Sequence, residues 1–150
     1  MQLTRYTDYA FRTLIYLNHS SGRLVTISEI AEAYGISRNH LVKVVHALGR
    51  HGFIETFRGK HGGLRLGREP ASIRLDEVVR HMEDRLEPVN CDTPPCPIRE
   101  YCQLRGITHE AMDAFLTTLS GYSLADLAGD DRTTLPWPAP SDQDDDARAS

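Results

Sequence analysis

The stretch T-I-S-E-I-A-E-A-Y-G-I-S-R-N-H, residues 26–40, predicts a helix-turn-helix. Thr26, followed three residues later by Glu29, forms a capping box that opens the first helix. Gly35 supplies a natural stop for that helix, and Ser37 is placed to cap the second one. Two helices joined by so short a turn are typical of proteins that read DNA.

The second helix of this motif has an apolar face and a polar N-terminal end. Gly52 should end it, and its buried face should hold Leu41, Val44, Val45 and Leu48. We expect the polar end to enter a major groove, where Arg, Asn and Ser side chains can hydrogen-bond base edges. The candidate DNA-contacting residues of this helix are Ser37, Arg38, Asn39, His40 and Lys43.

A two-stranded wing is predicted directly after the second helix. F-I-E-T-F at 53–57 and L-R-L at 64–66 resemble short strands, and R-G-K-H-G-G at 58–63 joins them. Glycines at the tip allow close backbone approach, and the basic side chains could reach phosphates or a minor groove. The candidates are Arg58, Lys60 and His61, although a basic hairpin tip is also often merely solvated.

The charge distribution favours a polyanionic partner, although the net charge of the chain is −4. Residues 1–68 contain ten Lys/Arg and four Asp/Glu, whereas residues 69–150 contain seven and seventeen. A basic half beside an acidic half is expected when one region of a protein meets DNA. An ordinary helical core with a solvated face would explain the two helices, but not the wing and the charge split.

At 150 residues, the chain should be one domain, or one domain with an appendage, of a mostly α class with a small β-wing. Residues 1–68 are predicted to form the winged helix-turn-helix region, and 69–128 a cysteine loop and a long dimerisation helix. The acidic, proline-rich tail at 129–150 should be disordered. Without an apolar run that could span a bilayer or a signal-peptide segment, a cytoplasmic protein with reduced thiols is expected.

Three further helices follow from apolar spacing. One is expected over 8–18, with Thr7 or Asp8 as its N-cap. A short helix is expected over 75–84, and a long amphipathic one over about 99–121.

All three cysteines of the chain fall in N-C-D-T-P-P-C-P-I-R-E-Y-C, residues 90–102. An odd number of thiols in one short loop disfavours a disulfide framework, and thiolates favour zinc, copper(I) or an iron–sulfur cluster. Zinc is the weaker choice because there is no second cysteine pair and His109 is seven residues past the last cysteine. Three buried apolar thiols would need apolar neighbours, which the polar and proline residues do not supply. Three thiolates with one ligand from elsewhere suit an iron–sulfur cluster.

Several segments, in chain order, resemble the NsrR branch of the Rrf2 superfamily of winged-helix regulators, a superfamily that also contains the IscR branch. The resemblance covers about residues 1–128 and has no counterpart for the tail. The segments are M-Q-L-T-R-Y-T-D-Y-A-F-R-T-L-I-Y at 1–16, Y-G-I-S-R-N-H-L-V-K-V at 34–44, R-G-K-H-G-G-L-R-L-G at 58–67, V-N-C…C…C and Y-S-L-A-D-L at 122–127.

The resemblance implies a homodimer that binds palindromic operator DNA and carries one cluster per subunit, [4Fe–4S] or [2Fe–2S]. The fourth ligand would be Asp8 of the partner subunit, and Arg12, one turn on, could pair with Asp8. In the IscR branch a histidine three residues after the last cysteine takes the ligand role; Arg105 stands there, which favours NsrR. Three ligands would come from the loop: Cys91, Cys96 and Cys102.

The implied function is that of a transcriptional repressor, not an enzyme, whose cluster senses nitric oxide. Nitrosylation would displace the weak carboxylate ligand, release the DNA and derepress genes for nitric-oxide detoxification. The alternatives are an IscR-like sensor of cluster supply, a thiol-redox switch and a zinc-stapled winged-helix regulator. A cysteine-dependent enzyme is disfavoured because no nucleophile motif surrounds any cysteine.

Overall fold

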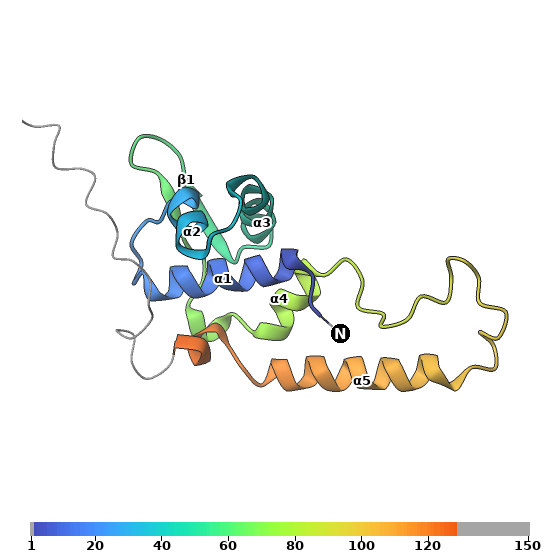
Figure 1. Ribbon diagram of the computed structural model, residues 1–150. Helices are drawn as coiled ribbons and strands as arrows, with labels where there is room; N and C mark the ends of the chain where they lie inside the picture. The colour runs from blue at the N-terminus through green and yellow to red at the C-terminus, as the bar shows by residue number, and fades with distance from the viewer. Residues whose placement is uncertain (1, 129–150) are drawn as a thin grey trace, which may run out of the picture.

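The computed structural model describes residues 2–128, which form a largely helical protein with one short hairpin (Figure 1). The predicted class, mostly α with a small β-wing, is confirmed. The tail predicted at 129–150 lies outside the described residues. In chain order the elements are α1 (Arg5–His19), α2 (Ile27–Tyr34), α3 (Arg38–Arg50), β1 (Ile54–Phe57), β2 (Gly63–Leu66), η1 (Pro70–Ser72), α4 (Leu75–Met82), α5 (Gln103–Ser120) and η2 (Leu124–Ala128).

Helix α1 begins before the predicted start at residue 8, and its N-cap is Thr4. The hydroxyl of Thr4 accepts a hydrogen bond from the backbone N–H of Thr7 at 3.4 Å. The predicted caps, Thr7 and Asp8, were wrong, since both lie inside the helix and Thr7 is fully buried. The apolar spacing becomes regular only from Ala10, but tertiary packing of Tyr6 and Thr7 extends the helix by a further turn.

The core surrounds α1, which lies between two layers. Helices α2 and α3 and the hairpin lie on one side of it, and α4 and η2 lie on the other (Figure 1). Between α1 and η2, the side-chain amide of Asn18 donates to the backbone carbonyl of Leu124 at 3.2 Å. The predicted buried face of α3 is confirmed for all four residues: Leu41, Val44, Val45 and Leu48. The fully buried residues of the core include Ala10, Leu14, Val25, Ile30, Phe53, Ile73 and Val78.

The helix-turn-helix forms as its sequence predicts. The Thr26 hydroxyl accepts from the N–H of Glu29 at 3.1 Å, which caps α2. Gly35 ends α2 in the left-handed region, with φ +62°, which a glycine adopts without steric cost. Ser37 occupies the N-cap position of α3 but makes no side-chain capping hydrogen bond, so its hydroxyl remains available to a ligand.

The wing is an antiparallel pair in which Ile54 faces Leu66 and Phe57 faces Gly63. Val25 extends it, because its backbone exchanges hydrogen bonds of 2.9 and 2.7 Å with Leu64. The tip is crowded: a Cβ at Gly62 would lie 2.2 Å from the carbonyl oxygen of Phe57. The path of the tip therefore depends on the absence of a side chain at Gly62.

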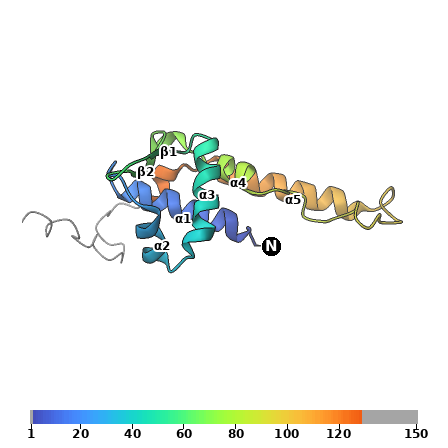
Figure 2. The ribbon, with the colours of Figure 1, turned by 90° about the horizontal axis from the view of Figure 1, so that it is seen from above.

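The chain after α4 leaves the body as an extended arm and returns as α5, so that arm and helix project together to one side (Figure 2). We call residues 83–102 the cysteine arm. Helix α5 begins at Gln103 rather than at the predicted 99, because the preceding residues are in turns, including a 3.0 Å bond from Tyr101 N–H to the Ile98 carbonyl. Within residues 2–128, no helix is long and apolar enough to cross a membrane.

We predict that Gly62→Ala destabilises the protein by about 1–3 kcal/mol, because its Cβ meets backbone that has to move. Gly49→Ala is the matched control: it lies in α3 with nothing within 4 Å of its Cβ, and alanine should stabilise that helix by up to about 1 kcal/mol. Denaturant unfolding of both variants measures the difference. An unchanged free energy of unfolding in Gly62→Ala would contradict the crowded wing tip.

Candidate functional site

We call α3 the recognition helix. Its N-terminal end presents its polar side chains to solvent. The buried residues Leu41 and Val44 fix the opposite face against the core. The ion pairs within residues 2–128 involve none of the polar side chains at this helix end, so these side chains are available to an external partner. All five predicted DNA-contacting residues are exposed: Ser37, Arg38, Asn39, His40 and Lys43.

The wing adds a second basic surface on the same side of α1 as the recognition helix (Figure 1). Its three predicted contact residues, Arg58, Lys60 and His61, are all exposed. On the strands below them, Arg65 is already engaged: it pairs with Glu55 at 2.8 Å and lies 4.7 Å from the ring centroid of Phe57. The tip cations are therefore the part of the wing best placed to reach a phosphate.

The three cysteines are free thiols, each half-buried in an arm whose other residues are mostly exposed. A turn joins the first two, since the N–H of Cys96 donates to the Cys91 carbonyl at 3.0 Å. Cys102 takes the N-cap position of α5 without a side-chain capping bond. Asn90 orders the start of the loop, because its Oδ1 accepts from the N–H groups of Asp92 and Thr93, both at 3.1 Å.

The donor chemistry of the arm fits a soft metal or an iron–sulfur cluster, because thiolates are the ligands that such groups prefer. Over the described part of the chain, however, no group of three or more His, Cys, Asp or Glu side chains is arranged to hold a metal ion. A single subunit thus supplies the ligand types without bringing them to one point. Convergence would require movement of the arm or a contribution from a second subunit.

Asp8, the predicted fourth ligand, lies on α1 and is paired with Arg12, as the i,i+4 spacing predicted. Arg12 Nε lies 3.1 Å from both carboxylate oxygens, and the two side chains are 43% and 44% exposed. The guanidinium of Arg12 also lies 5.6 Å from the ring centroid of Tyr34, the last residue of α2. Burial raises the pKa of Tyr34 to about 12, so its ring stays neutral at physiological pH. Arg12 thus connects Asp8 to the helix-turn-helix.

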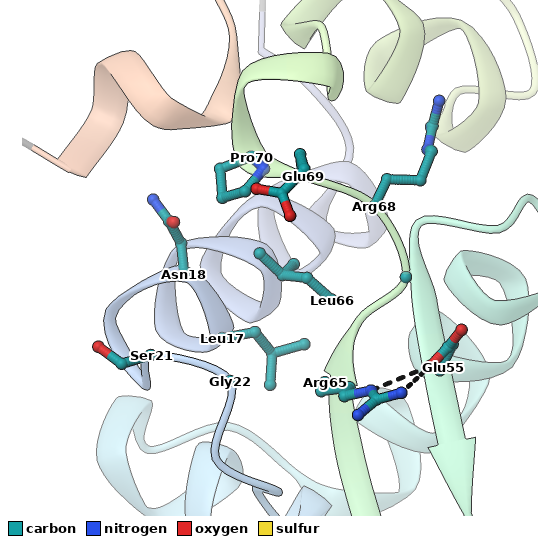
Figure 3. A pocket seen from close by; sticks show the side chains of 11 residues that line it. Leu17, Asn18, Ser21, Gly22, Glu55, Arg65, Leu66, Arg68, Glu69 and Pro70 are labelled. Atoms are coloured by element: carbon teal, nitrogen blue, oxygen red, sulfur yellow. Dashed lines mark hydrogen bonds and ion pairs between the residues drawn. The ribbon is translucent and has the colours of Figure 1, made fainter.

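Hollows also lie beside these features. One of about 370 Å³ adjoins the cysteine arm, and both Cys91 and Arg105 line it. The larger, of about 630 Å³, lies between the end of α1 and the base of the wing (Figure 3). Its charged lining is partly used internally, because Arg65 donates to Glu55 through two hydrogen bonds of 3.0 and 2.8 Å.

An exposed polar helix end beside a basic, glycine-rich wing is the arrangement of a winged-helix transcription regulator that binds DNA. Residues 3–130 match the model of the Rrf2 family, described as iron-dependent transcriptional regulators, and the chain belongs to this family. Its members are transcription regulators rather than enzymes; they bind DNA and are typically dimeric.

Solved structures share the fold of this chain. CymR, the global cysteine regulator of B. subtilis, is 25% identical with a TM-score of 0.67, over 85% of this chain and 96% of that one. IscR of T. potens is 20% identical with a TM-score of 0.70, over 92% of this chain and 94% of that one. The oxidised form of Staphylococcus aureus CymR is 23% identical with a TM-score of 0.67, over 86% and 97%.

A pair of stacked imidazoles joins the end of the recognition helix to α4. His51 follows α3, and its ring centroid lies 4.2 Å from that of His81, with 29° between the ring planes. Burial, and then the nearby charges of His81 and Arg50, lower the pKa of His51. Sequence reasoning missed this contact, because nothing local relates the two residues.

We predict that stability falls as the solution is acidified through the lowered pKa of His51. The unfolded state takes up the proton at a higher pH, so the stabilisation is complete above the ordinary histidine pKa of about 6.5 and is lost below the folded value. His51→Gln should therefore lose less stability than the parent protein between about pH 7.5 and about pH 5.5. Unfolding at both pH values measures this, with His61→Gln at the exposed wing tip as control; identical pH dependence in His51→Gln and the parent would refute the assignment.

Proposed function

We propose that the protein is a homodimeric, cytoplasmic repressor in which one iron–sulfur cluster per subunit, [4Fe–4S] or [2Fe–2S], senses nitric oxide. The observation that carries the proposal is the set of three half-buried thiols on an arm outside the core, in a family described as iron-dependent. The three thiolate ligands would be Cys91, Cys96 and Cys102, and Asp8 of the partner subunit would be the fourth. Ligation from both subunits would account for an incomplete ligand set in one chain.

When bound, the cluster supplies iron that reacts with nitric oxide. Asp8 is the ligand most easily lost, because a carboxylate is a harder donor than a thiolate. Arg12 then offers that carboxylate an alternative partner, since its Nε already reaches both oxygens at 3.1 Å. Release of Asp8 would therefore free the arm of one subunit from α1 of the other, and the two recognition helices would lose their relative spacing.

Dimerisation would use α5. Among the described residues this helix buries only Leu116, although its sequence is amphipathic. Leu104 and Ile107 are 54% and 61% exposed in the single chain. Pairing this face with a second copy would remove these side chains from water and place two recognition helices against the half-sites of a palindrome.

A thiol-redox regulator is the second candidate. It is favoured by the free thiols of the arm and by the likeness to Staphylococcus aureus CymR, which has been solved in an oxidised form. A zinc-stapled regulator and an IscR-like sensor of cluster supply are further alternatives, although Arg105 stands where the IscR-like histidine is expected.

The visible spectrum and metal content of protein purified without oxygen would separate these functions. The proposal would be supported if the protein contains iron and sulfide and is coloured, and if nitric oxide bleaches the spectrum in step with the release of operator DNA. Colourless protein that responds to oxidants would favour the thiol switch, and stoichiometric zinc would favour the stapled regulator. A coloured protein that is indifferent to nitric oxide would favour the sensor of cluster supply.

We predict that Asp8→Ala lowers the operator affinity of the iron-loaded protein towards that of the iron-free protein. Its effect on folding should be at most about 0.5 kcal/mol, because the lost pair with Arg12 is a half-exposed i,i+4 pair. Gel-shift titration under anaerobic conditions measures the affinity, with Glu69→Gln as a control for the charge change away from the arm. Parent-like affinity in loaded Asp8→Ala would exclude Asp8 as the coupling ligand.

We predict that Asn39 and Lys60 contribute differently to DNA binding. Asn39→Ala should remove about 1–3 kcal/mol of discrimination between operator and scrambled DNA, the value of one base contact. Lys60→Ala should weaken both DNAs alike and reduce the salt dependence by about one phosphate contact. Titrations at several salt concentrations distinguish the two; equal losses on both DNAs for Asn39→Ala would rule out base reading.

A further inference from the structure

The start of α1 contacts both the cysteine arm and the recognition helix of its own subunit. The N–H and the hydroxyl of Thr4 both donate to one carboxylate oxygen of Glu83, at 2.7 and 3.0 Å. Two residues later, the hydroxyl of Tyr6 donates to the backbone carbonyl of Lys43 at 3.1 Å. Glu83 is the first residue of the arm, and Lys43 belongs to the recognition helix.

The contact at Glu83 has a favourable electrostatic setting. Its carboxylate accepts two hydrogen bonds from the N-cap residue of α1, where the helix dipole favours a negative charge. Glu83 is also the C-cap of α4. The residue at which the arm leaves α4 is therefore hydrogen-bonded to the start of α1. A shift of the arm at its origin would therefore act directly on Thr4.

The contact at Tyr6 bridges a hollow. A hollow of about 200 Å³ is lined by residues from the start of α1 and from the recognition helix, among them Tyr6, Tyr9 and Val44. The hydrogen bond of Tyr6, whose side chain also lines this hollow, is one of the contacts that fix the separation of the two helices. Burial raises the pKa of Tyr6, while the nearby charge of Arg50 lowers it and that of Asp84 raises it, so its hydroxyl keeps the proton that it donates.

We propose that the first turn of α1 couples the cysteine arm to the recognition helix within one subunit, with Glu83 and Tyr6 as positioning residues. A displacement at Glu83 is carried by the rigid turn from Thr4 to Tyr6, and then to the backbone of Lys43, whose side chain is a candidate DNA contact. This route stays inside one chain, whereas the ligand role proposed for Asp8 acts between subunits. The signal that this coupling would transmit rests on the proposed function, whereas the hydrogen bonds of Thr4 with Glu83 and of Tyr6 with Lys43 do not involve iron.

The test uses the full chain with Glu83→Ala, Tyr6→Phe and the double variant. Tyr9→Phe, which lines the same hollow, and Glu87→Ala, another acidic residue of the arm, are the matched controls. Hydrogen–deuterium exchange of the iron-free protein measures the exchange rates of the amides of the recognition helix, and the amides of the wing strands are the reference for opening elsewhere in the subunit.

If the link exists, Glu83→Ala and Tyr6→Phe each speed exchange in the recognition helix about fivefold, the ratio that one hydrogen bond typically contributes. The wing strands and both controls should stay at the parent rate, and the double variant should be no faster than the faster single variant. Unchanged recognition-helix exchange in Glu83→Ala, equal acceleration in the wing strands, or additive effects in the double variant would each overturn the proposal.

Operator affinity, measured on the same variants with and without iron, separates this inference from the proposed function. If the parent protein binds operator equally well in both forms, the proposed iron-dependent function fails, and the exchange data still decide the link. If the parent depends on iron and the link exists, Glu83→Ala should reduce the ratio of the two affinities by about fivefold while the cluster spectrum is unchanged.

Discussion

The burial of α1 on two opposite sides is the constraint on which the rest of the structure depends. Leu14 of α1 is completely buried in the core, and Asn18 of α1 hydrogen-bonds to Leu124 of η2. Neither the helix-turn-helix nor the layer formed by α4 and η2 contacts the other as extensively as it contacts α1. Since close-packed interfaces resist gradual deformation, a movement of α1 relative to one layer has to be felt by the other.

The elements that sequence predicted best are those whose signals are local. The capping box at Thr26 and the left-handed Gly35 involve neighbours within a few residues, and both formed as expected. The starts of α1 and α5 were misplaced because other contacts determine them. Thr4 is secured by Glu83, which is distant in the chain, and turns occupy the residues before Gln103.

The candidate site divides in the same way. The exposed polar end of the recognition helix and the basic wing tip follow from periodicity and glycine content, and the i,i+4 pair of Asp8 and Arg12 follows from helical geometry. Contacts between distant segments could not be predicted from the sequence; one of them is the hydrogen bond from Tyr6 to the Lys43 carbonyl. Spacing identified the three thiols as a group, but not their failure to converge in one chain, because a proline-rich loop has no periodicity that fixes side-chain directions.

The separation of the cysteine arm from the core affects how such a regulator can evolve. No residue of the arm belongs to the hydrophobic cluster around α1, so most substitutions there leave the folding free energy of the body nearly unchanged. Mutational drift in the arm is therefore tolerated more readily than drift in α1 or α3. The arm can thus change its chemistry by small steps without passing through unfolded intermediates, while the DNA-binding body keeps its fold.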